Sequence, residues 1–256
     1  MLTPDSTIPG TVFLIIRNKK GDTRMTNPTI LITGANRGIG LKLSEQFAKD
    51  GWQVLGCCRN PADAGELKAL GERGLAIEVH ALDVTHYEQM AALADQLSNR
   101  PIDILLSNAG IYGSKGAGFG EIDAQEWRQV LEVNTIAPLM LVQAFVEQVA
   151  ASQQKLVAVI SSKVGSIADN TSGGSYIYRS SKTAVNQVVK CLSIDLADRD
   201  ISVISLHPGW VQTEMGGPNA EISTDESVSG LKGILQTAGL AQSGQFIEYD
   251  GSSIPW

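Results

Sequence analysis

Cysteine is scarce in this chain of 256 residues, which contains only three. Cys57 and Cys58 are adjacent and Cys191 lies far from them, so the spacing fits neither a disulfide framework nor a metal site. The three histidines are equally scattered, and we predict no metal site. Free, buried thiols are expected instead, which favours a reducing compartment and hence a cytoplasmic protein.

Long apolar runs and an excess of basic charge are also lacking. No uninterrupted apolar stretch approaches the roughly 18–20 residues of a membrane span, so no membrane partner is predicted. The 20 Lys and Arg residues are outnumbered by 27 Asp and Glu, which leaves a net charge of −7. Because nucleic acids and anionic membranes require a basic face, this balance argues against both. The 43% of apolar residues excludes disorder as the main state.

Residues 1–27 differ from the remainder of the chain. They carry four basic residues against two acidic ones, although the chain as a whole is acidic. We interpret them as an N-terminal extension that is unstructured or not native, with an additional strand at residues 11–16 as the alternative. The functional argument therefore begins at residue 28.

From residue 28 onward, short β-branched and apolar runs alternate with segments of helical length. Residues 156–160 are apolar throughout, which indicates a strand buried on both faces and hence a parallel sheet. We predict one α/β domain over residues 28–256, a Rossmann-type doubly wound parallel sheet of about seven strands with helices on both faces. The expected strands are residues 29–33, 52–57, 75–81, 103–107, 156–161, 202–206 and 245–248. The expected helices are residues 40–50, 63–71, 87–97, 124–150 and 177–196.

A glycine-rich segment, residues 33–40, connects the first expected strand to the first expected helix. Its glycines are spaced Gly-x3-Gly-x-Gly, which allows a tight turn whose backbone N–H groups approach a pyrophosphate at a helix N-terminus. A lone glycine triplet could be only a turn, but here both flanking elements are expected. The predicted cofactor-binding residues of this loop are Gly34, Asn36, Arg37, Gly38, Ile39 and Gly40.

The end of the second strand indicates which dinucleotide binds. An NAD site places an acidic residue roughly 20 residues beyond the loop, on the ribose 2′-hydroxyl. Here Arg59 occupies that neighbourhood, and residues 57–62 contain no acidic residue. Together with Arg37, Arg59 supplies positive charge for a 2′-phosphate, so NADP (NADPH) is favoured over NAD. Alternatively, both arginines are solvated surface residues.

Tyr178 and Lys182 are four residues apart in an expected helix and therefore share one face. A cation beside a phenol favours the phenolate and lowers the phenol pKa, so such a pair could protonate an alkoxide that forms from a carbonyl. A tyrosine and a lysine at this spacing often occur by chance, so the pair alone does not indicate a catalytic site. However, Ser162 follows one expected strand, Asn108 follows another, and Asn134 lies in a helix, where asparagine is not favoured.

The motifs along residues 28–256, and the order in which they occur, resemble those of the short-chain dehydrogenase/reductases. They are Thr-Gly-x3-Gly-x-Gly, Asn-Ala-Gly, the helical asparagine, serine, Tyr-x3-Lys and Pro-Gly. The segment between Ser162 and Tyr178 and the terminal Ile254-Pro255-Trp256 resemble the branch that contains the C-factor signalling proteins and sniffer-type carbonyl reductases.

The resemblance implies a role for each catalytic residue. Tyr178 would be the general acid/base, and Lys182 would bind the nicotinamide ribose and lower the Tyr178 pKa. Ser162, rather than the adjacent Ser161, would orient the substrate carbonyl. Asn134 would hold a water that relays protons through Lys182. Further cofactor contacts are implied for Asp83, Val84, Asn108, Ala109, Gly110, Pro208, Gly209, Val211 and Thr213, in addition to Tyr178 and Lys182.

The implied function is NADPH-dependent reduction of aldehydes, ketones or quinones by hydride transfer. The same residues would also support alcohol oxidation. A regulatory or signalling protein of the C-factor type, which binds NAD(P) with little or no turnover, is the alternative. The expected partners are a small carbonyl or alcohol substrate and other copies of the chain. A homodimer or homotetramer would pair the helices of Asn134 and Tyr178, unless the segment between Ser162 and Tyr178 blocks that pairing.

Overall fold

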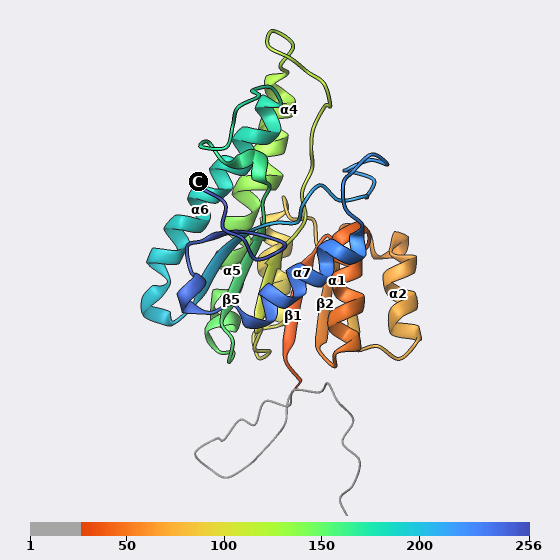
Figure 1. The fold of residues 1–256 in the computed structure, drawn as a ribbon. Helices are drawn as coiled ribbons and strands as arrows, with labels where there is room; N and C mark the ends of the chain where they lie inside the picture. Colours follow the sequence, from red (N-terminus) through yellow and green to blue (C-terminus); the bar gives the residue numbers. More distant parts are fainter. Residues whose placement is uncertain (1–26) are drawn as a thin grey trace, which may run out of the picture.

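A computed structural model describes residues 27–256 and contains one sheet of seven parallel strands (Figure 1). The strand order is β3-β2-β1-β4-β5-β6-β7, with the direction of progress reversing between β1 and β4. The strands are β1 (Thr29–Thr33), β2 (Gln53–Cys58), β3 (Ile77–Ala81), β4 (Ile104–Ser107), β5 (Leu156–Ile160), β6 (Ser202–His207) and β7 (Phe246–Glu248). The predicted Rossmann-type fold is confirmed. The proposed N-terminal extension lies outside the described residues, apart from Asn27.

Within residues 27–256, seven α-helices accompany the sheet. They are α1 (Gly38–Lys49), α2 (Gly65–Glu72), α3 (Tyr87–Gln96), α4 (Ala124–Leu131), α5 (Ala137–Ala150), α6 (Tyr176–Asp195) and α7 (Thr224–Thr237). Of these, α1, α2 and α7 cover one face and α3, α5 and α6 cover the other (Figure 1).

Alternate residues of the strands feed two separate cores. Ile30 and Ile32 of β1 pack under α1 and α7, whereas Leu31 packs on the opposite face beneath α3 and α5. All three side chains are fully buried. Since burying one such side chain stabilises the fold by about 1.5–3 kcal/mol, each central strand is anchored on both faces. The continuous apolar runs of the sequence have this origin.

Helix α7 was not among the predicted helices. Ser223 caps it by accepting a hydrogen bond from the Glu226 backbone N–H, and the first turn carries acidic residues, which favour a helix N-terminus. This cap was the signal available in the sequence. The thiol prediction also needs correction, because Cys57 and Cys58 are buried but Cys191 is exposed.

The helical region Ala124–Ala150 is long and apolar enough to cross a membrane by length and composition. It is not an uninterrupted apolar run, because polar residues such as Arg128 lie within it, and it was therefore not identified from the sequence as a candidate membrane span. In the fold, its side chains Leu141, Phe145 and Val149 are buried against the sheet, as in the core helix of a globular domain.

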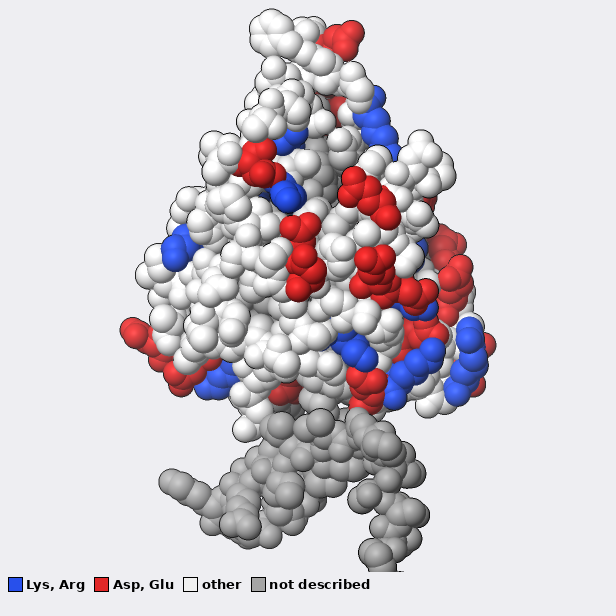
Figure 2. Space-filling model, viewed as in Figure 1, with Lys and Arg blue, Asp and Glu red and all other residues white. Residues whose placement is uncertain are grey.

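The charged side chains are intermixed on the face drawn in Figure 2. Lys and Arg are interspersed with Asp and Glu there, most densely at the lower right, and the centre left of the face is mostly uncharged. Several of the cations form ion pairs, including Lys42 with Asp225 and Lys232 with Asp50. This distribution differs from the continuous basic stripe that is typical of a nucleic-acid-binding surface.

Candidate functional site

The candidate residues lie at the carboxyl edge of the sheet, which is the upper edge in Figure 1. The glycine loop follows β1, the Asn108 segment follows β4, Ser162 follows β5 and Pro208 follows β6. Because all strands are parallel, every one of these segments leaves the sheet at the same edge. Side chains far apart in sequence therefore meet above the point where the strand order reverses.

The glycine loop makes a tight turn into α1. Gly34 and Gly38 have positive φ angles of 66° and 54°, which few other residues adopt without strain. A Cβ on Gly40 would lie 2.3 Å from the Gly34 carbonyl oxygen, so only glycine allows this approach of helix and strand. The loop thus presents a helix N-terminus with bare backbone, which fits the pyrophosphate of a dinucleotide.

Thr33 and Asn108 hold this loop in place. The Asn108 side-chain amide donates hydrogen bonds to the carbonyl oxygens of Thr33 (2.8 Å) and Gly34 (3.2 Å). In return, the Thr33 hydroxyl accepts from the backbone N–H groups of Asn108 and Ala109. The Asn-Ala-Gly segment was expected to contact the ribose, and the structure adds that its asparagine supports the glycine loop.

Replacing Gly40 by alanine is expected to weaken NADPH binding strongly and to destabilise the fold by about 1–3 kcal/mol. The added methyl group would overlap the Gly34 carbonyl, and α1 would have to shift. Gly65→Ala is a suitable control, since its Cβ would meet nothing within 4 Å. Calorimetric titration with NADPH, together with urea unfolding, measures both effects. Equal behaviour of the two variants would contradict this role for Gly40.

At the adenosine end of the expected site, Arg59 is exposed just beyond β2. The pKa of Asp83 is lowered, mainly because its carboxylate accepts a hydrogen bond from the Thr85 backbone N–H, with a smaller contribution from the Arg59 charge. Arg59 and Asp83 therefore lie close together across the ends of β2 and β3. Val84 follows and is half-buried against the α3 side of the core.

The segment after β6 returns to the glycine loop. Gly209 has a φ of 82°, and the buried Val211 forms an isolated bridge with Ile222. Thr213 lies beside Gly38, where an added Cβ would be 3.5 Å from the threonine methyl. The next residue, Glu214, forms an exposed ion pair with Arg37. Pro208 accepts a hydrogen bond from the buried hydroxyl of Ser227 in α7.

Tyr178 lies in the first turn of α6, with its ring close to one aromatic ring and one ammonium group. Tyr112 stacks on it with a centroid distance of 4.4 Å, and the Lys182 ammonium lies 5.6 Å from the ring centroid. Burial, with a contribution from Tyr112, raises the Tyr178 pKa to about 12, although a hydrogen bond with Ser162 acts to lower it. A lowered pKa was expected from the neighbouring Lys182, but burial dominates and the pKa is raised.

The Lys182 ammonium is directed elsewhere because it donates a 2.9 Å hydrogen bond to the Ile160 carbonyl oxygen. The lysine side chain is only 4% exposed, and burial lowers its pKa to about 8. Near neutral pH it is therefore a mixture of charged and neutral forms. A lysine with such a pKa is suited to passing protons.

Asn134 lies in a π-helical turn (Glu132–Ile136) between α4 and α5. Pro138 explains this turn, since it lacks the N–H that would donate to the Asn134 carbonyl in a regular helix. The asparagine side chain accepts a hydrogen bond from the Ile111 N–H and donates to the Ile111 carbonyl and to the Ser181 hydroxyl. A Cβ on Gly110 would lie 3.3 Å from the Asn134 Oδ1 and 3.7 Å from the Lys182 Nζ, so asparagine and lysine converge there.

The structure distinguishes the two adjacent serines. Ser161 is 1% exposed and donates to the Lys182 carbonyl, whereas the half-buried Ser162 bonds the Tyr178 hydroxyl. Arg179, which follows Tyr178, donates to the Val164 carbonyl and the Ser172 hydroxyl. It therefore connects α6 to the segment that follows Ser162.

Several residues that support this site were not identified from the sequence. They are Tyr112, which stacks on Tyr178, Ser181, which bonds Asn134, and Glu214, which pairs with Arg37. Thr33 was part of the glycine motif, but its support of the Asn108 segment was not foreseen. No spacing pattern marks the others, since each contact joins elements that are distant in sequence.

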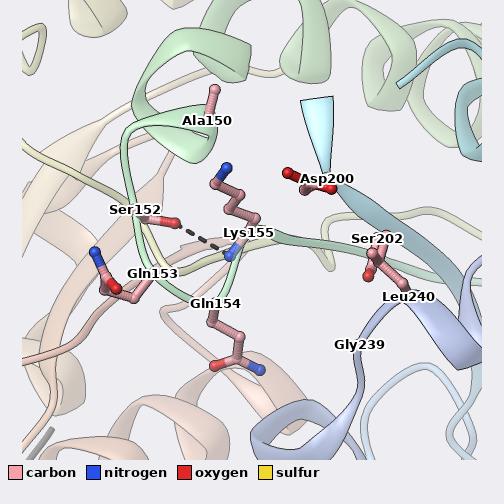
Figure 3. A pocket seen from close by; sticks show the side chains of 9 residues that line it. All are labelled: Ala150, Ser152, Gln153, Gln154, Lys155, Asp200, Ser202, Gly239 and Leu240. Carbon is pink, nitrogen blue, oxygen red and sulfur yellow. Dashed lines mark hydrogen bonds between the residues drawn. The ribbon is translucent and has the colours of Figure 1, made fainter. Parts of the chain in front are cut away.

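A cavity of about 570 Å³ lies elsewhere, at the amino ends of β5 and β6 (Figure 3). It is lined mainly by polar residues such as Gln154, Lys155 and Asp200, and it contains none of the candidate site residues. Ligands of open parallel sheets bind at the opposite edge. Within residues 27–256, no group of His, Cys, Asp and Glu side chains is arranged to hold a metal ion.

Solved structures of similar fold include carbonyl reductases. The structure resembles the carbonyl reductase Sniffer of D. melanogaster with a TM-score of 0.84 and 32% identity, over 90% of this chain and 100% of the other. It also resembles the NADPH-bound carbonyl reductase from chicken fatty liver, with a TM-score of 0.83 and 31% identity, over 90% and 99% of the two chains.

Sequence comparison leads to the same group of proteins. The chain is 36% identical over 167 residues to C-signal of Myxococcus xanthus, which covers 65% of this chain and 100% of that protein. The sequence profile of the short chain dehydrogenase family matches residues 28–223. The chain therefore belongs to the short-chain dehydrogenase/reductase family of oxidoreductases, in the branch that includes C-signal and Sniffer.

Proposed function

We propose that the protein is an NADPH-dependent carbonyl reductase that acts on aldehydes, ketones or quinones. The observation that carries this proposal is the convergence of Ser162, Tyr178, Lys182 and Asn134 at the carboxyl edge, beside the glycine loop. The similarity to an NADPH-bound carbonyl reductase supports it. A protein that only binds a dinucleotide has no need for a proton-donating set of this kind.

When bound, the cofactor would supply a hydride to the carbonyl carbon. Tyr178 would donate its proton to the carbonyl oxygen, and Ser162 would hold that oxygen by a hydrogen bond. Lys182, with a pKa of about 8, would return a proton toward Tyr178, with Asn134 beside it at Gly110. Gly34, Gly38 and Gly40 would leave room for the pyrophosphate, and Pro208 to Thr213 would flank the nicotinamide.

The protonation state of Tyr178 suits it to the role of a general acid. With a pKa of about 12, its hydroxyl is protonated at neutral pH and available as an acid. Alcohol oxidation would instead need the phenolate as a base, which burial and the Tyr112 ring oppose.

Arg59 would set the preference for NADPH. It is exposed at the end of β2 beside Asp83, and Arg37 lies in the glycine loop. Replacing Arg59 by aspartate is expected to weaken NADPH binding roughly tenfold or more and to improve NADH binding, since a carboxylate repels a 2′-phosphate and accepts from a 2′-hydroxyl. Titration with both nucleotides measures this change. An unaltered preference would remove Arg59 from the assignment.

The test of the proposed function is NADPH oxidation with a panel of aldehydes, ketones and quinones, with Tyr178→Phe as control. Turnover by the parent that is lost in the variant supports the reductase. The similarity to C-signal favours a second candidate, a signalling protein that binds NAD(P). Tight NADPH binding without turnover on any compound would favour that candidate instead.

The assembly and location of the protein are part of the same proposal. We expect a cytoplasmic homodimer or homotetramer that pairs the α5 and α6 helices. Ile136, in the π-helical turn, and Ile194, at the end of α6, are 43% and 64% exposed and would be covered by such pairing.

A further inference from the structure

Residues 254–256 lie outside the candidate site but are held firmly against the edge strand of the sheet. Ile247 of β7 forms an isolated antiparallel bridge with Ser253, so the chain turns back along this strand. The Ile254 N–H then donates a 2.8 Å hydrogen bond to the Phe246 carbonyl, and the Ile254 side chain is only 5% exposed. Backbone bonds and burial therefore anchor this short segment to β7.

The Trp256 side chain fixes the end of the segment. Its indole stacks on the Phe246 ring, with the centroids 5.6 Å apart and an angle of 16° between the ring planes. Phe246 is buried and Trp256 is 39% exposed, so the indole covers a side of the buried ring. Stacked aromatic rings attract one another beyond what their buried area provides. The backbone of Trp256 is thereby held in a defined position.

From this position the backbone oxygen of Trp256 reaches the segment that follows Ser162. It accepts hydrogen bonds from the Ala168 N–H (3.1 Å) and from the Ser166 hydroxyl (3.3 Å). Ser166 is only 2% exposed, so its hydroxyl bonds to the protein rather than to solvent. Residues 166–175 belong to no helix or strand, and contacts of this kind therefore determine where the segment lies.

A short 3-10 turn, Lys163–Gly165, connects the anchored segment to Ser162. The Gly165 N–H donates to the Ser162 carbonyl (2.8 Å), and the Ser166 N–H donates to the first carbonyl of the turn (2.9 Å). A Cβ on Gly165 would lie 2.8 Å from the α6 backbone, so the turn packs directly on that helix. A displacement of Ser166 would therefore pass through the turn to Ser162, whose hydroxyl bonds Tyr178.

We propose that Trp256 is a positioning residue of the candidate active site, which holds Ser162 at hydrogen-bond distance from Tyr178 through the 3-10 turn. This inference rests on the proposed reductase function. Arg179 holds the turn from the side of α6, and Trp256 holds the segment after the turn from the side of β7. Because a hydrogen-bond donor must be aligned with the oxygen that develops charge, a displaced Ser162 slows the chemical step.

The test is a double-substitution cycle between Trp256 and Ser162, measured as kcat with NADPH and a carbonyl compound that the parent reduces. Trp256→Ala removes the stacked ring and is expected to lower kcat about tenfold, whereas Trp256→Phe keeps an aromatic ring and should stay within about twofold of the parent. In a Ser162→Ala background, Trp256→Ala should cause no further loss, because the group that it positions is already absent. An equal loss in both backgrounds, or full activity of Trp256→Ala, would overturn the proposal.

Nucleotide binding separates positioning from general damage. The dissociation constant of NADPH, measured by calorimetry, should change by less than about twofold in Trp256→Ala, since the glycine loop and Arg59 lie on other strands. A loss of affinity as large as the loss of kcat would contradict a role that acts through Ser162. If Trp256→Ala does not fold, Ser166→Ala removes one of the two donors to the Trp256 oxygen and enters the same cycle.

Hydrogen exchange of the full chain, followed by mass spectrometry, tests the contact without turnover. In Trp256→Ala the amides of residues 163–169 should exchange about tenfold faster than in the parent, because the acceptor of the Ala168 N–H is displaced. The amides of β1 should not change. Unchanged exchange in residues 163–169 would overturn the anchoring. Faster exchange there, in a protein whose parent reduces no carbonyl compound, would overturn the reductase function and leave the anchoring intact.

Discussion

Replacing Tyr178 by phenylalanine is expected to lower kcat for carbonyl reduction by about 10²- to 10⁴-fold, the usual contribution of a positioned general acid. The substitution removes only the hydroxyl, which is the proposed proton donor and lies beside Ser162. The ring remains and can still stack on Tyr112. NADPH affinity should fall far less than kcat, since the glycine loop and Arg59 lie on other elements and are retained. Steady-state kinetics and nucleotide titration of the same preparation measure both quantities.

The neighbouring Tyr176 provides the matched control. It begins the same helix and is 43% exposed, so Tyr176→Phe also removes one hydroxyl from α6 but should leave kcat within about twofold of the parent, as is usual for surface substitutions. If the Tyr178 variant were as active as the Tyr176 variant and the parent, the proton would have to come from another group. A large loss in both would indicate that the helix, rather than the acid, had been disturbed.

The strands were predictable because their burial leaves a direct trace in the sequence. Residues of β5 point alternately into two cores, so every position is apolar and the run is continuous. The glycine loop was predictable for a related reason, since Gly40 must be bare to pass the Gly34 carbonyl. In contrast, α7 was overlooked. Its buried Val228, Leu231 and Leu235 have helical spacing, but glycines interrupt the pattern.

The pKa values and charge contacts of the site were less predictable from the sequence than the identity of its residues. The spacing of Tyr178 and Lys182 indicates a shared helix face, and they are neighbours. The spacing does not reveal that the ammonium is bonded to the Ile160 carbonyl, or that the phenol is buried against Tyr112. Both effects come from strands and loops distant in sequence. The direction of the Tyr178 pKa was therefore the opposite of the expected one.

Lys182→Met is expected to lower turnover by about 10²-fold or more without lowering stability at pH 7. Burial holds the Lys182 pKa at about 8 in the folded protein, against 10.5 for an ordinary lysine. Below pH 8 both the folded and the unfolded chain bind the proton, and the cost of burying the ammonium, up to about 3 kcal/mol, is present in full. Methionine removes this cost but leaves the Ile160 carbonyl without its donor, which costs about 1–3 kcal/mol.

The pH dependence of the free energy of unfolding shows whether Lys182 affects stability through its charge or only through its packing. Between pH 8 and 10.5 the unfolded chain binds a proton that folded Lys182 has released, so the stability of the parent should rise with pH relative to that of Lys182→Met. Urea unfolding without nucleotide, at pH 7 and at several values up to about 10, follows this difference. Lys190→Met, an exposed position on the same helix, controls for general alkaline effects. A methionine variant that is several kcal/mol less stable at every pH would contradict this explanation. It would mean that burying Lys182 costs the folded protein little, so that no stability is lost in exchange for proton transfer.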